Sequence, residues 1–143
     1  MAALTKDKPR TYTSLPHKLE NTLPIQAEKV FVGAALSIDS NGDVGGLAGS
    51  ETFAGFCLEQ VDNAGGSAGA KSCKVAQKGH VKLDVTGADD PDDVGSAVFA
   101  SDEDTFTLTS TTSHSRIGKV VRHISGTTCV VAFEAAQVNK VLG

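Results

Sequence analysis

Apolar and polar residues alternate most regularly between Cys73 and Val85, which predicts a long strand. Side chains of a strand point alternately to its two faces. The residues that point outward are basic. This row fits a solvated face, a sheet edge protected by lysines, a docking row for an acidic partner, or a nucleic-acid contact. We expect Val75, Gly79, Val81, Leu83 and Val85 on the inward face, and Lys74, Lys78, His80 and Lys82 on the outward face.

Shorter apolar runs separated by Gly, Ser, Thr, Asn and Asp predict six further strands. Asn41-Gly42 favours a two-residue type I′ hairpin turn, and Ser125-Gly126 favours a second tight hairpin. This spacing predicts an all-β fold, a small antiparallel β-barrel or β-sandwich with an extended N-terminal arm and little helix. The six runs are 30–38, 53–58, 97–100, 105–110, 116–124 and 127–134.

The first 26 residues differ from the remainder of the chain. Pro9, Pro16 and Pro24 exclude a continuous helix and a central strand. We therefore divide the chain into an extended arm, residues 1–26, and a β-rich domain, residues 27–143. The arm is either unstructured when free or ordered along a neighbour, and in the second case its apolar contacts are Tyr12, Leu15, Leu19 and Leu23.

Charge and hydropathy narrow the class of partner. The formal net charge is −4 over 143 residues, so no global field attracts nucleic acid or an anionic membrane. The chain shows neither a signal peptide nor an apolar run of membrane-spanning length, which predicts a soluble protein made in a cytoplasm.

Cys57, Cys73 and Cys129 are odd in number and lack metal-binding spacing, so we expect small buried side chains.

Candidate chemistry is sparse. The four histidines, His17, His80, His114 and His123, stand apart in sequence, and no serine or cysteine lies in a nucleophile motif. Asp39 opens a calcium-loop pattern that lacks the required Gly and Glu. The acidic turn 89–93 is typical of a solvated loop. We predict no catalytic residue, no metal site and no cofactor. The enzymatic alternative is a small β-barrel enzyme that uses His80, His114 or His123 together with the acidic turn.

Four elements together resemble a known family. They are Gly79–Val85, Gly95–Thr107 with its G-S-A-V-F-A-S-D-E-D-T-F-T sequence, Arg116–Val120, and Cys129–Phe133. In this order they resemble the decoration, or head cement, proteins of tailed bacteriophages. The similarity covers roughly residues 27–135, and the arm carries no motif of the family.

This resemblance implies a structural virion protein on the outer surface of an assembled head, synthesised in the host cytoplasm. It implies that the protein bridges major capsid subunits and associates with itself, as a trimer or alternatively a dimer. Under this hypothesis the interface residues are Tyr12, Leu15, Leu19, Leu23, Lys74, Lys78 and Lys82. The alternative is a phage tail or host-surface binding module that contacts glycans through the Thr/Ser loop 110–115.

Overall fold

The computed structural model describes residues 4–13 and 19–136, and regular structure in these residues is almost all β-strand. The prediction of an all-β fold with little helix is confirmed. The single described helix is a 3₁₀ turn, η1, Pro91–Asp93. The strands are β1 Leu19–Pro24, β2 Lys29–Val30, β3 Ala35–Ile38, β4 Val44–Gly46, β5 Phe53–Cys57, β6 Val61–Asp62, β7 Ser72–Thr86, β8 Ala97–Asp102, β9 Thr105–Thr107, β10 Ser115–Ser125 and β11 Thr128–Glu134.

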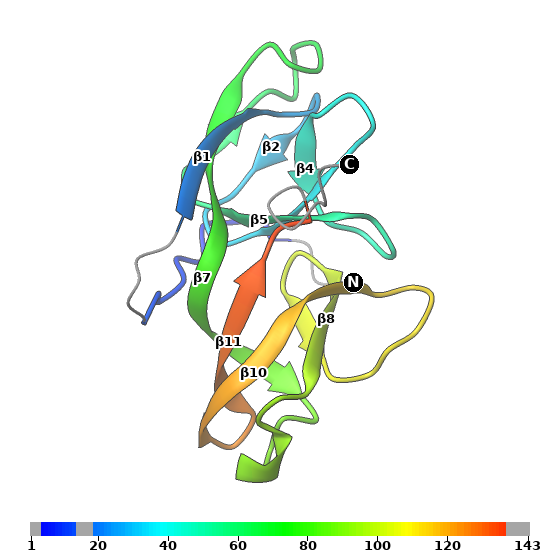
Figure 1. Ribbon diagram of the computed structural model, residues 1–143. Helices are drawn as coiled ribbons and strands as arrows, with labels where there is room; N and C mark the ends of the chain where they lie inside the picture. Colours follow the sequence, from blue (N-terminus) through cyan, green and yellow to red (C-terminus); the bar gives the residue numbers. More distant parts are fainter. Residues whose placement is uncertain (1–3, 14–18, 137–143) are drawn as a thin grey trace.

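Five of these strands close into a barrel (Figure 1). The sheet runs β11-β10-β8-β9-β7, and β7 pairs again with β11, from Asp84 opposite Thr128 to Lys78 opposite Glu134. This second pairing closes the ring, so these strands leave no open edge along the contact. All strand pairs of the barrel are antiparallel except β7 and β9, which run parallel.

The long strand β7 joins two hydrophobic cores. Cys73 and Val75 point into one core, whereas Ala76, Val81, Leu83 and Val85 point into the other. The alternation predicted for 73–85 is therefore correct at both ends and interrupted between them. Ala76 and Gln77 are both buried because β5 and β1 flank this part of the strand. Because of this interruption, side chains of a single strand belong to both cores.

The barrel core is built around aromatic rings. Phe133 packs edge-on against Phe56 at a centroid distance of 5.0 Å, and Phe53 packs against Phe56 at 5.6 Å. Phe106 joins the cluster at 6.0 Å from Phe56. Four of the six phenylalanines thus meet in one place, where edge-to-face packing adds to the area they bury. The second core is smaller and aliphatic, with Ile25, Val30, Leu36, Val44 and Val75 among its members.

Both predicted hairpin turns occur with altered geometry. The amide of Gly42 donates to the Asp39 carbonyl, and the Asp39 amide donates to the Asp43 carbonyl. Only Gly42 has a positive φ, so the loop is a three-residue turn and the two-residue type I′ prediction is wrong. The second loop is shifted by one residue, because Ser125 pairs with Thr128 across Gly126-Thr127.

The predicted strand 30–38 is divided. Gly33, with φ +91°, turns the chain between β2 and β3. This positive φ is the reason that the apolar run does not form one continuous strand.

Two described parts of residues 1–26 lie along β7. Tyr12 bridges to Val81, and β1 pairs antiparallel with the first half of β7. Lys78 is opposite Leu19 on one side and opposite Glu134 on the other, so β1 and β11 occupy the two edges of β7.

Candidate functional site

Residues 4–13, which we call the N-terminal segment, follow the surface of the barrel in extended form. The Lys8 amide donates to the Val32 carbonyl at 2.8 Å, and the Thr13 amide donates to the His80 carbonyl at 3.1 Å. The Lys82 amide of β7 donates back to the Thr11 carbonyl at 2.9 Å. The segment thus adds main-chain hydrogen bonds to an edge of β7, as an added strand does.

Arg10 is the central anchor of this segment. Its side chain is only 6% exposed. Its Nη2 donates to Asp104 Oδ1 at 2.7 Å, and its Nε donates to the Gly33 carbonyl at 2.8 Å. The guanidinium also lies over two core rings, 5.7 Å from the Phe56 centroid and 5.4 Å from the Phe106 centroid. A buried arginine is stable here because a carboxylate, a carbonyl and two aromatic faces surround it.

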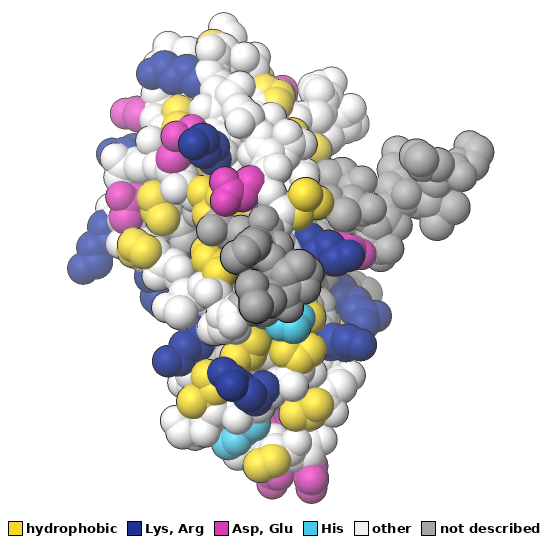
Figure 2. Space-filling model, turned by 60° about the vertical axis from the view of Figure 1, so that its left-hand side comes forward, with side chains coloured by type: hydrophobic (Ala, Val, Ile, Leu, Met, Phe, Trp, Pro, Cys, Tyr) yellow, Lys and Arg dark blue, Asp and Glu magenta, His cyan; other side chains and the backbone are white. Residues whose placement is uncertain are grey.

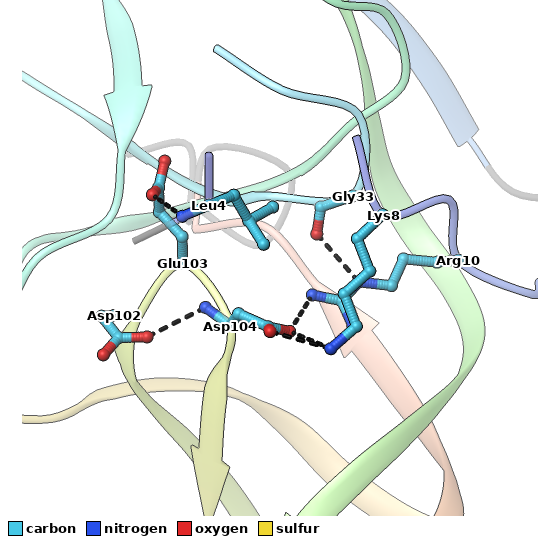
Figure 3. Close-up of polar contacts among 7 residues, drawn as sticks. All are labelled: Leu4, Lys8, Arg10, Gly33, Asp102, Glu103 and Asp104. Atoms are coloured by element: carbon cyan, nitrogen blue, oxygen red, sulfur yellow. Dashed lines mark hydrogen bonds and ion pairs between the residues drawn. The ribbon is translucent and has the colours of Figure 1, made fainter. Parts of the chain in front are cut away.

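The turn between β8 and β9 receives the segment (Figure 3). Lys8 Nζ lies 2.8 Å from Asp104 Oδ2, and the Leu4 amide donates to Glu103 Oε2 at 2.9 Å. The Asp104 amide in turn donates to Asp102 Oδ1, which fixes the turn that presents these carboxylates. Glu103 is mostly buried, and this burial raises the pKa of its carboxyl above the ordinary value.

Tyr12 ends this row of contacts. Its ring lies 6.1 Å from the Phe133 centroid, tilted by 56°, and packs on the barrel core. Burial raises the pKa of its hydroxyl above the ordinary tyrosine value. Tyr12, one of the predicted interface residues, thus makes its contacts within this chain. Its ring helps to hold the N-terminal segment on the barrel.

A cavity of about 300 Å³ lies between the N-terminal segment and the end of β7. Its charged groups are already engaged: Asp104 binds Lys8 and Arg10, and Asp84 accepts a hydrogen bond from the Thr127 hydroxyl. The lining contains neither histidine nor cysteine. The lining residues are Lys8, Arg10, Asp84, Thr86, Asp104, Thr105 and Phe106.

The other predicted interface residues are spread along two paired strands. In β1, Leu19 is 47% exposed and Leu23 packs partly against the second core, whereas Leu15 lies outside the described residues. The three lysines of β7 are all exposed, but they are not equivalent. Lys78 forms an ion pair with Glu134 at 3.0 Å, and Lys74 lies on the half of β7 that pairs with β1.

Two of the histidines considered for catalysis, and part of the acidic turn, have local partners. His114 Nδ1 is 2.9 Å from the Thr109 carbonyl, and His123 Nε2 is 2.9 Å from the Gly126 carbonyl. In the acidic turn, Asp90 caps η1 and accepts from the Asp92 amide. His17 lies outside the described residues. Within 4–13 and 19–136, no three His, Cys, Asp or Glu side chains are placed to hold a metal ion.

The three cysteines are free and buried, as predicted. Burial raises the pKa of the Cys129 thiol to about 11, which keeps it protonated and unreactive.

The anchoring residues Lys8, Arg10 and Asp104 were missing from the predicted site. One signal was present, since Lys8, Arg10 and Tyr12 alternate and therefore share one side of an extended chain. Their partner Asp104 lies more than 90 residues away and has no distinguishing pattern.

No helix in the described part of the chain is long and apolar enough to cross a membrane. Comparison with known protein families finds no family model that matches the chain, and comparison with curated proteins finds no match.

Proposed function

We propose that this protein is a structural component of a tailed-phage virion. It binds the outer surface of the assembled head and stabilises the head by bridging major capsid subunits. One observation carries the proposal: the four sequence elements that resemble decoration proteins are neighbours in space. Gly79–Val85, Gly95–Thr107, Arg116–Val120 and Cys129–Phe133 supply parts of β7, β8, β9, β10 and β11, the five strands of the closed barrel.

The arrangement of the barrel supports a covering and clamping role. Its interior is filled by phenylalanine and valine side chains, and the cavity beside it presents charges that are already paired. Contacts on a repeating shell are multiplied by the number of copies, so a modest surface per copy is sufficient. We propose self-association as a trimer, with a dimer as the alternative, and place the protein on the outside of the capsid.

The test uses purified heads that lack this protein. Adding the full chain should produce saturable extra density on the outer surface, and the heads should resist heating better after binding. The control is the Phe133→Ala variant, which removes the central ring of the barrel: it should unfold at a lower temperature and bind heads only while it is folded. Heads that stay bare at saturating protein would refute the proposal. Binding to host cells without binding to heads would favour the host-surface module instead.

A further inference from the structure

The outer face of β7, β11 and β10 gathers basic side chains from two strands. Lys82 is opposite Val130, and Val130 is opposite Arg122 on the far side of β11. One step further along, His80, Ala132 and Lys119 form a second row in the same way. Their neighbours in sequence, such as Val81 and Val131, point into the barrel core, so both rows lie on the outside. We call Lys82, Arg122, Lys119 and His80 the basic face.

The charges of this face are uncompensated within the described part of the chain. Lys82, Lys119 and Arg122 are exposed, and none of them forms an ion pair with a described residue. Two carboxylates of the same sheet have other partners: Glu134 pairs with Lys78, and Asp84, two residues after Lys82, accepts a hydrogen bond from the Thr127 hydroxyl. A chain of net charge −4 therefore carries a local positive surface.

The centre of the face is apolar. Val130 points outward but is only 3% exposed, and Ala132 beside it is half-buried. Val130 is thus covered within this chain, and Ala132 is the apolar group between the rows that a partner can reach. Ile124, at the end of β10, is 39% exposed. The lower half of Figure 2 shows Lys, Arg and His side chains gathered around hydrophobic ones.

We propose that the basic face is the surface that docks on the capsid, and that its counterpart is a carboxylate-rich patch on the outside of the major capsid protein. This inference rests on the proposed function and adds the contact surface and the chemistry of the partner. An apolar centre with a charged rim is the usual anatomy of a protein interface. Complementary charge orients such an encounter and raises its rate.

An acidic protein surface fits this face better than a nucleic acid does. The four residues of the face include no Phe, Tyr or Trp, the large aromatic side chains on which bases stack best. The net charge of the whole chain would also repel a long polyanion, whereas a local carboxylate patch is within reach of the face alone.

Charge-reversal variants test the assignment by titration onto heads that lack this protein. We expect Lys82→Glu and Arg122→Glu each to weaken binding about tenfold or more at low salt, and the double variant to lose it. Raising salt from about 0.05 M to about 0.5 M should weaken wild-type binding and narrow these differences. Lys71→Glu is the matched control: it is exposed, makes the same change of charge, and lies about 35 Å along the chain from Lys82.

The outcomes separate the two proposals. If the wild-type protein binds while Lys82→Glu and Arg122→Glu bind equally well, the basic face is refuted and the decoration function stands. If Lys71→Glu weakens binding as much as they do, the effect is one of total charge, and the face is again refuted. If the wild-type protein leaves heads bare, both proposals fail. Circular dichroism of each variant checks that the fold is retained.

Discussion

Arg10→Ala should release the N-terminal segment from the barrel. The substitution removes the hydrogen bonds to Asp104 and to the Gly33 carbonyl, and the contacts with the Phe56 and Phe106 rings. A hydrogen bond to a charged group contributes about 1.5–3 kcal/mol, and a desolvated cation–π contact contributes about 2 kcal/mol. In this variant Asp104 still forms its ion pair with Lys8, which limits the free-energy cost of losing its arginine partner. We therefore expect a loss of about 3 kcal/mol in docking free energy.

Amide hydrogen exchange measures this loss locally. The Lys8 and Thr13 amides report docking directly, because their acceptors, the Val32 and His80 carbonyls, lie outside the segment. A loss of about 3 kcal/mol corresponds to exchange faster by about 100-fold at these amides where local opening controls it. Amides inside the barrel should change less. The control is Lys6→Ala, which truncates an exposed side chain of the same segment.

The result that refutes this reasoning is specific. If Arg10→Ala leaves the Lys8 and Thr13 amides as protected as Lys6→Ala does, the guanidinium contributes nothing to docking. The anchor would then reside in the main-chain hydrogen bonds and in Tyr12.

Three further predictions concern stability. Gly33→Ala should lower the free energy of unfolding in urea clearly more than Gly42→Ala does. An alanine at either positive φ costs about 1–2 kcal/mol, but only the methyl group at position 33 would meet the Lys8 carbonyl oxygen. Equal losses would contradict the close approach. Phe133→Ala should lower the free energy of unfolding by about 3–5 kcal/mol; a loss below about 1 kcal/mol would show that the ring cluster is not central. Burial raises the pKa of Glu103, so protonation of its carboxyl favours the folded state at low pH, and this contribution is lost as pH rises through the raised pKa. In Glu103→Gln the free energy of unfolding should therefore depend less steeply on pH over this range. An unchanged pH dependence would contradict the prediction.

The fold class could be predicted because strand signals are local. The alternation in 73–85 and the apolar runs of β10 and β11 each give the direction of side chains within a few residues. Turn geometry was harder to predict, since Asn41-Gly42 is compatible with several loop lengths and the hydrogen bonds of Asp39 select one of them. The burial of Ala76 depends on β1 and β5, which are distant in sequence, so no local pattern reveals it.

The N-terminal segment shows the same limit on a larger scale. In the described part of residues 1–26 no helix forms, as the prolines predict, and β1, which follows the segment in sequence, lies at an edge of the sheet. Where the segment docks, however, is decided by Asp104 and Gly33, and nothing in their sequence context marks them as its partners. A cation and an aromatic residue that alternate in an extended stretch predict a common face but not the surface it meets.

The basic face shows that closure of the sheet changes which charged side chains are neighbours. Along the sequence, Lys74, Lys78 and Lys82 form one row on one strand. In the barrel this row is divided, because Lys78 is neutralised by Glu134 and Lys74 lies where β7 pairs with β1. Lys82 instead acquires Arg122 as a neighbour across β11. The electrostatic potential that a partner encounters is the sum of the contributions from charges on adjacent strands. A docking surface on this fold is therefore a property of the pairing of β7, β11 and β10, and substitutions that test it must be chosen across strands.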